Sequence, residues 1–261
     1  REGYKSRANK TVWIFTIVYF GITIAAFLCY WLAGMDSFDA INHAFSVVST
    51  GGFSTKDLSI ATYNSAAINL ITMFFMLIAS IHFGLIFMVF ATRSLKPLNN
   101  PVLKFYVLSI VISALLVSLS LKFQGTCFTW GQSLMTGFFH VISAISTTGF
   151  AISDNNTWPL FACIITIIIT IPCGMAGSTT GGIKADRMLL IFKTIGQQVK
   201  NVVHPSSINR LHIGNHILDK DEIYPHIVFM CLYFITIGAS VALTIMSGMD
   251  VQNAVATSIS C

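Results

Sequence analysis

Two stretches of the chain carry nearly the same residues at a fixed separation. Residues 43–57 read H-A-F-S-V-V-S-T-G-G-F-S-T-K-D, and residues 140–154 read H-V-I-S-A-I-S-T-T-G-F-A-I-S-D. The shared frame, H-x-x-S-x-x-S-T-x-G-F-x-x-x-D, is displaced by 97 positions without a gap. A repeat at a fixed period indicates that one structural unit has been built more than once. Each copy predicts a short helix with polar residues that ends in a turn rich in threonine and glycine.

Long runs without a charged side chain surround both copies. Charged residues make up 10% of the chain and hydrophobic residues 54%, whereas a soluble domain carries about 25% charged residues. Because about 20 apolar residues cross a hydrocarbon core, these runs predict membrane spans and argue against a soluble helical protein. The span predicted at 158–199 is too long and too interrupted to be one simple helix. The spans are expected at 11–33, 63–92, 103–122, 158–199 and 224–248.

The repeated pieces at 37–49 and 130–145 are too short to cross a membrane, so we interpret both as re-entrant helices. This interpretation leaves 13 of the 15 basic residues on one side, and only Lys56 and Lys122 on the other. The positive-inside rule makes the basic side cytoplasmic. The acids expected at the outer side either attract cations or are ordinary loop charges; they are Asp36, Asp39, Asp57, Asp154 and Asp250.

The two turns carry the residue types that ligate hard cations. At membrane depth, non-helical backbone is tolerated where it is buried in protein or lines a watery cavity. Glycine allows successive carbonyls to face one direction, carbonyls can replace the hydration shell of a cation, and threonine hydroxyls add oxygen ligands. A hairpin used only for packing is the alternative. The candidate residues are Thr50, Gly51, Gly52, Phe53, Thr147, Thr148, Gly149 and Phe150.

A break is predicted in the fourth span, where residues 171–184 read I-P-C-G-M-A-G-S-T-T-G-G-I-K. Pro172 removes a helix hydrogen bond and four glycines follow, so a straight helix is not expected. Such a break either faces a cavity or is a kink used for packing. A phosphate-binding loop is excluded because the G-K-[ST] ending and a preceding strand are missing.

A third copy begins near the C-terminal end. Gly248-Met249-Asp250 repeats Gly34-Met35-Asp36, which introduces the first copy. Counting from Asp250 predicts that 250–261 is a third pore helix, and that the chain stops ahead of its turn. We therefore expect a fragment, with at least one further unit before Arg1.

The motifs S-T-G-G-F-S-T-x-D, S-T-T-G-F and G-S-T-T-G-G-I-K resemble the Trk/Ktr/HKT superfamily of potassium transporters, and most of all its bacterial TrkH and KtrB membrane subunits. The resemblance implies an all-α membrane protein with repeated M1–P–M2 units (helix, re-entrant pore loop, helix) around a pseudo-fourfold pore, here truncated. It places pore unit two at 1–98 (M1 11–33, pore helix 37–49, filter 49–54, M2 63–92), unit three at 99–204 (M1 103–122, pore helix 130–145, filter 146–151, broken M2 158–199), a cytoplasmic loop at 205–222 and the start of unit four at 223–261 (M1 224–248, pore helix 250–261).

The resemblance also implies roles for these residues. The two turns would be potassium filters, with Gly52 and Gly149 as the filter glycines. Potassium would be the transported ion and the metal held at the filter residues, with no covalently bound cofactor. The broken M2 would form a gate below the filter, with Lys184 hindering a passing ion. The gate residues would be Gly174, Gly177, Ser178, Thr179, Thr180, Gly181, Gly182 and Lys184.

The same resemblance implies a multi-pass protein of the bacterial plasma (inner) membrane, with the basic loops cytoplasmic and the filter mouth outside. Its partners would be the lipid bilayer, a second copy in a homodimer, and a cytoplasmic nucleotide-binding regulatory ring like TrkA or KtrA; nucleic acid is not expected. Segments 93–104 and 205–222 are the candidates for contact with the ring, although 205–222 is also explained as a plain connector.

Other functions fit the sequence less well. An intramembrane enzyme needs a converging set of nucleophile, base and acid, which we do not find. A secondary transporter with broken helices, for another monovalent cation, stays an alternative, although the repeats share one orientation instead of being inverted. His212 and His216 have metal-like spacing but no third ligand nearby.

Overall fold

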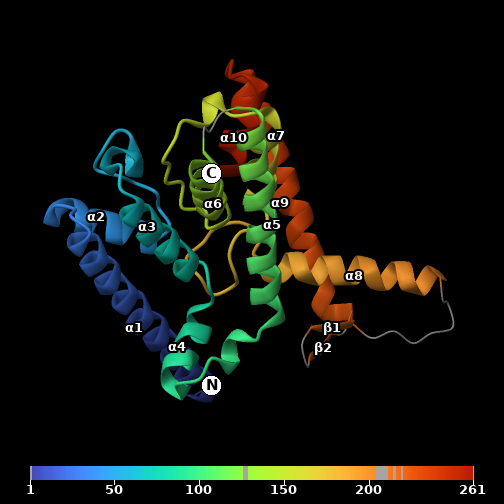
Figure 1. The fold of residues 1–261 in the computed structure, drawn as a ribbon. Coiled ribbons are helices and arrows are strands. Elements are labelled where there is room, and N and C mark those ends of the chain that lie inside the picture. Colours follow the sequence, from blue (N-terminus) through green and yellow to red (C-terminus); the bar gives the residue numbers. More distant parts are fainter. Residues whose placement is uncertain (1, 126–128, 204–210, 214–215, 219, 261) are drawn as a thin grey trace.

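The computed structural model describes residues 2–125, 129–203, 211–213, 216–218 and 220–260. The regular secondary structure of the described residues is almost wholly helical (Figure 1), as the sequence predicts. β1 (Leu211–Ile213) pairs antiparallel with β2 (His216–Leu218), and three short 3-10 helices lie between α-helices of the described chain. The α-helices are α1 (Glu2–Leu32), α2 (Ser37–Val48), α3 (Ala66–Ala79), α4 (Phe83–Thr92), α5 (Pro101–Phe123), α6 (Trp130–Ile145), α7 (Leu160–Thr170), α8 (Ala185–Val203), α9 (Lys220–Met246) and α10 (Val251–Ser260).

Three of the described helices are long and apolar enough to cross a membrane. Their apolar parts cover Thr11–Leu32, Pro101–Phe123 and Ile223–Met246. These segments match the spans expected at 11–33, 103–122 and 224–248. The helix pair α3 and α4 reaches the same length and hydropathy only when the two are taken together.

The span expected at 63–92 is formed by two helices, α3 and α4, and not by one continuous helix. Its chain bends by 97° between Ala79 and Phe83. The hydroxyl of Ser80 lies 2.8 Å from the carbonyl oxygens of both Met76 and Leu77, so it competes with the backbone where α3 ends. The side chain of His82 then accepts the N–H of Gly84 and caps the start of α4.

The two repeated pieces form α2 and α6, within one residue of the predicted bounds 37–49 and 130–145. Each begins with a capping side chain, from Asp36 in α2 and from Thr129 in α6. The capping side chain accepts a backbone N–H that has no partner inside the helix. The third copy forms α10, again behind a span, as the repeat predicts.

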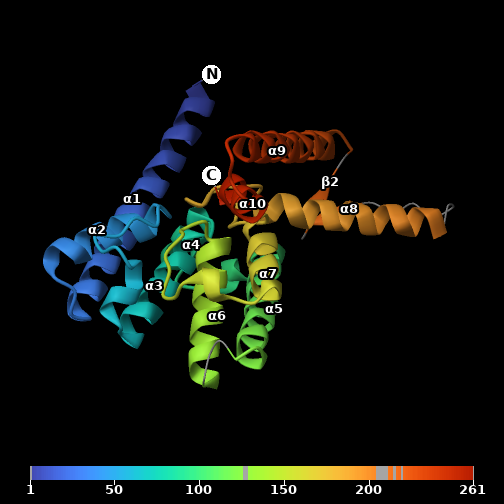
Figure 2. The same cartoon turned by 90° about the horizontal axis from the view of Figure 1, so that it is seen from above.

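The long segment expected at 158–199 is broken as predicted. It forms α7, the non-helical loop 171–184 and α8. Figures 1 and 2 show α8 running across the direction of α5, with its far end projecting from the rest of the molecule. Of the loop expected at 205–222, the structure describes β1, β2 and the first residues of α9; residues 205–210, 214–215 and 219 lie outside the described residues, as does Cys261.

The helices of the two repeats pack into one apolar core. Buried residues of this core come from α1 to α8 and include the fully buried Tyr30, Tyr106 and Phe139. The hydroxyl of Tyr30 donates to Thr72 across α1 and α3, and the hydroxyl of Tyr106 donates to Ser80 across the two repeats. This core holds α2 and α6 so that both turns reach the same region.

Candidate ion pathway

The turns that follow α2 and α6 have the same backbone conformation. Thr50 and Thr147 have φ angles of 54° and 53°, and Gly52 and Gly149 follow with φ angles of 69° and 86°. A positive φ is an outlier for a β-branched residue and marks strain that the surrounding structure must hold. The same strain at equivalent positions of two repeats points to a shared functional conformation.

The two turns touch each other. A Cβ atom placed on Gly52 would lie 1.8 Å from the carbonyl oxygen of Thr148 and 3.2 Å from Cα of Gly149. Only glycine therefore fits at Gly52 without moving the second turn. The structure thus brings the predicted candidates Thr50 to Gly52 together with Thr147 to Gly149.

The aromatic residues after the two glycines differ in their surroundings. Phe150 is 1% exposed and stacks on His43 of α2, with ring centroids 5.8 Å apart. Its carbonyl oxygen accepts the hydroxyl of Ser143 at 2.7 Å. Phe53 is 81% exposed, and the equivalent hydroxyl of Ser46 is buried without a hydrogen-bond partner among the described residues. The carbonyl of Phe150 is therefore already engaged behind its turn.

Two buried histidines hold the chain that leaves each turn. His43 contacts the carbonyl of Asp39 at 2.8 Å and the hydroxyl of Ser54 at 2.9 Å through its two ring nitrogens. Nε2 of His140 contacts the hydroxyl of Ser153 at 3.1 Å. Both histidines therefore tie the chain that leaves a turn back to the helix that leads into it.

A carboxylate anchors the chain after the first turn. Asp39, in the first turn of α2 and outside the spanning helices, accepts the hydroxyls of Thr55 (2.6 Å) and Tyr63 (2.8 Å) and pairs with Lys56 (3.0 Å). The hydrogen bond from Thr55, followed by the bonds from Lys56 and Tyr63, lowers the pKa of Asp39 to about 2 against the opposing effect of burial. The charge of Asp39 is therefore offset by Lys56, and its carboxylate is engaged in holding the chain after the first turn.

The 171–184 loop lies directly against both turns. The hydroxyl of Thr50 lies 3.1 Å from the carbonyl oxygen of Thr179, and 2.7 Å from that of Ser49. The N–H of Gly181 donates to the hydroxyl of Thr147 at 3.0 Å. The threonines in the strained conformation are thus also those that contact the loop.

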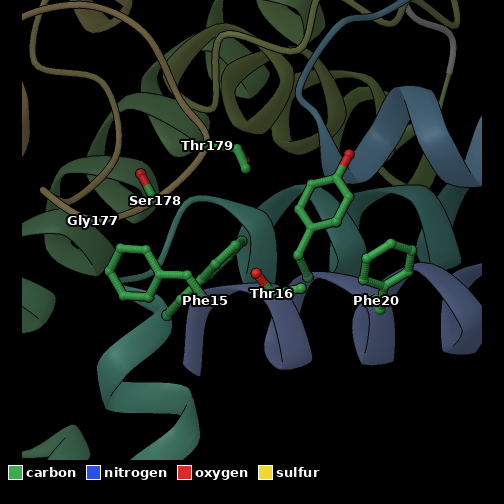
Figure 3. Close-up of a pocket in the computed structure, with 8 residues that line it drawn as sticks. Phe15, Thr16, Phe20, Gly177, Ser178 and Thr179 are labelled. Carbon is green, nitrogen blue, oxygen red and sulfur yellow. The ribbon is translucent and has the colours of Figure 1, made fainter. Parts of the chain in front are cut away.

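The remaining loop candidates are placed by contacts within the loop and with α8. Nζ of Lys184 donates to the carbonyl and the hydroxyl of Thr180, which also contacts the hydroxyl of Ser178. The N–H of Ala185 donates to the carbonyl of Gly174 at 2.9 Å. Figure 3 shows Gly177, Ser178 and Thr179 of the loop across a pocket of about 330 Å³ from Phe15, Thr16 and Phe20 of α1.

A second cavity, of about 460 Å³, lies where the turns, the loop, α9 and α10 meet. Thr50, Thr147 and Thr179 line it from one side. Sequence reasoning missed the residues that line it from α9 and α10, because the C-terminal part of the chain holds no complete repeat to align. Those residues are Tyr233, Thr236, Ile237, Ser240, Ser258 and Ile259. Hydroxyl oxygens of this kind suit hard monovalent cations.

Comparison with known proteins gives the family. A sequence profile of TrkH, described as a cation transport protein, matches residues 3–261. The chain belongs to the TrkH family. Its similarity to the TrkH family covers both turns, the loop between α7 and α8, and α9. Membership places the chain among membrane transport proteins and not among enzymes.

Individual TrkH-family members agree with the profile. The chain is 34% identical to the Trk system potassium uptake protein TrkH of Escherichia coli K12 over 245 residues, which cover 92% of this chain and 50% of that protein. It is 32% identical to TrkG of the same organism over 211 residues, covering 80% and 43%. The crystal structure of the potassium transporter TrkH from Vibrio parahaemolyticus superposes with a TM-score of 0.88 at 31% identity, covering 96% of this chain and 53% of that one. The chain thus spans about half the length of these relatives.

Proposed function

We propose that this chain is part of a potassium uptake protein, in which ions pass alongside the two turns and are stopped below them by the 171–184 loop. The observation that carries the proposal is the meeting of both strained turns at one hydroxyl-lined cavity that the loop borders. Relatives named as potassium uptake proteins support the choice of ion. The chemistry is dehydration, coordination and gated passage, without a covalent step.

In this proposal the carbonyl and hydroxyl oxygens of Thr50 to Phe53 and of Thr147 to Phe150 replace part of the hydration shell of the ion. The carbonyl of Phe150, which accepts Ser143, contributes least. α2 and α6 end at the turns, so their negative dipole ends face the ion. Lys184, held beside Thr180, places a positive charge next to the pathway and so hinders cations while the loop is in place.

Orientation and partners are parts of the same proposal. The basic segments face the cytoplasm of a bacterium, with the protein in its inner membrane as a homodimer. A nucleotide-binding regulatory ring docks on 93–104 and 205–222 and acts on the loop through α8. The link is direct, because Asp186 in the first turn of α8 accepts the N–H of Ala176 at 2.6 Å. Deletion of 206–220 in the full-length protein abolishes nucleotide regulation if the ring docks there, and unchanged regulation refutes the docking site.

The filter assignment is tested by Gly149→Ser in the full-length protein. A Cβ atom on Gly149 would meet nothing within 4 Å, so a serine side chain at this position acts on the ion path more than on packing, apart from the strain of its positive φ. We expect Rb⁺ flux into proteoliposomes to fall and Na⁺ to compete more strongly. Flux and selectivity equal to those of the wild type would refute the assignment, and would favour a broken-helix transporter with a different ion site.

A further inference from the structure

The bend between α3 and α4 presents an unexpected feature, because no proline or glycine lies between Ala79 and Phe83. Sharp bends in helices have identifiable causes, and one of them is insertion of another group into the hydrogen-bond ladder. At this bend the inserted group is the 171–184 loop, which is proposed above to be the gate.

Four backbone groups at the bend have partners outside their own helix. The carbonyl of Ala79 accepts both the N–H (3.3 Å) and the hydroxyl (3.1 Å) of Thr179. The carbonyl of Ser80 accepts the N–H of Met175 at 2.9 Å, and the N–H of Phe83 donates to the carbonyl of Gly177 at 3.0 Å.

The fourth group is the N–H of Gly84, which donates to Nδ1 of His82 at 2.8 Å. The same histidine ring covers the loop, since a Cβ atom on Gly177 would lie 3.0 Å from its Cδ2 and Nε2 atoms. The edge of His82 also meets Phe15 of α1, with ring centroids 6.0 Å apart.

These four groups are the ones that a continuous helix would pair with each other. In an α-helix the N–H of residue i donates to the carbonyl of residue i−4. Phe83 would then donate to Ala79, and Gly84 would donate to Ser80. The docked loop and a continuous α3–α4 helix therefore compete for the same hydrogen-bonding groups. Because unpaired backbone groups are costly in a membrane, one of the two arrangements must be present.

We infer that the bend is a clasp, in which the loop stays docked while α3 and α4 are broken and is released when they join into one helix. His82 is the positioning residue of the clasp, because it supplies the acceptor that Gly84 needs only in the broken state. This inference rests on the proposed function, since it takes the loop to be the gate. It adds that release of the loop, which belongs to the second repeat, depends on the α3–α4 segment of the first repeat.

Two substitutions at one position separate the capping role from mere packing. His82→Ala removes the acceptor for Gly84 and favours the continuous helix, since alanine is the best helix former. His82→Asn keeps an acceptor at a position where asparagine is among the best capping residues. From the usual effect of losing a cap, we expect alanine to shift the ratio of released to docked loop by about 2- to 30-fold relative to asparagine.

The experiment uses the full-length protein in proteoliposomes without a regulatory ring. Rb⁺ flux should rise in His82→Ala and stay at or below the wild-type level in His82→Asn. Spin labels at Leu70 and Phe90, both exposed in the described chain, report the bend independently of transport. Their separation should lengthen from that of the bent form, in which the two helices meet at 97°, toward about 30 Å in a continuous helix with a rise of 1.5 Å per residue.

The two readouts keep failure of the clasp apart from failure of the proposed function. An unchanged label separation in His82→Ala, or equal flux increases in the alanine and asparagine variants, overturns the clasp. If the wild-type protein transports no Rb⁺, the proposed function is wrong. The label separation still decides in that case whether His82 holds the bend.

Discussion

Gly52 and Gly149 occupy equivalent positions in the repeat, but the structure predicts that they tolerate substitution differently. Alanine at either position must adopt a positive φ, which costs about 1–2 kcal/mol. At Gly149 the added methyl group meets nothing within 4 Å. At Gly52 it would lie 1.8 Å from the carbonyl oxygen of Thr148, so the second turn must move by more than an ångström.

The atoms that block Gly52→Ala are backbone atoms, which cannot rotate away as a side chain can. Overpacking of this kind costs about 1–3 kcal/mol, in addition to the backbone strain that both variants share. A ligand site must also be held to within about 0.5 Å. We therefore expect Gly52→Ala to lose about 5- to 150-fold more transport than Gly149→Ala.

Both variants are made in the full-length protein and expressed in a bacterial strain that lacks its own potassium uptake systems. Initial Rb⁺ uptake and growth at low potassium are measured at equal amounts of protein in the membrane. The reasoning predicts that Gly149→Ala keeps the larger part of uptake. It is refuted if Gly149→Ala is as damaging as Gly52→Ala, or more so.

Two further predictions concern the anchors around the turns. Asp39→Asn removes the pair with Lys56 and should destabilise the protein by about 2 kcal/mol. Because the pKa of Asp39 in the folded protein is about 2, the difference in melting temperature between wild type and variant should be constant from pH 5 to 8. It should shrink only as the pH falls below 3.8, the ordinary pKa of an aspartate. Gly174→Ala places a methyl group 2.8 Å from the carbonyl oxygen of Ser80, which should undock the loop and raise basal Rb⁺ flux about 5- to 150-fold. Gly181→Ala is the matched control, since its nearest contact is 3.9 Å away and flux should change little.

Much of the local structure around the pathway was predictable from the sequence. The repeated S-T-x-G-F motif predicts the helix ends and turns, because glycine adopts the positive φ of a turn without a steric cost and helices commonly end ahead of such a residue. Pro172 and the glycines after it predict the break in the 158–199 segment for an equally local reason. Charge-free runs predict three of the spans.

The features that the sequence did not predict depend on contacts between distant residues. The bend at Ser80 is stabilised by partners about 100 positions away, and no residue at the bend forbids a continuous helix. The repeat makes Phe53 and Phe150 equivalent, yet only Phe150 lies between the two repeats, where it stacks on His43. The pair of Asp39 with Lys56 was not predicted, because the two residues lie 17 positions apart, on either side of the turn.

The central claim, that the two turns form part of one potassium filter, is tested most directly by locating a bound ion. Crystals of the full-length protein grown in Rb⁺ give an anomalous signal at the position of the ion. The account predicts a peak beside both turns, within coordination distance of oxygens from Thr50 to Gly52 and from Thr147 to Gly149. A structure with ordered turns, an ion peak elsewhere along the pathway and none beside the turns would contradict it.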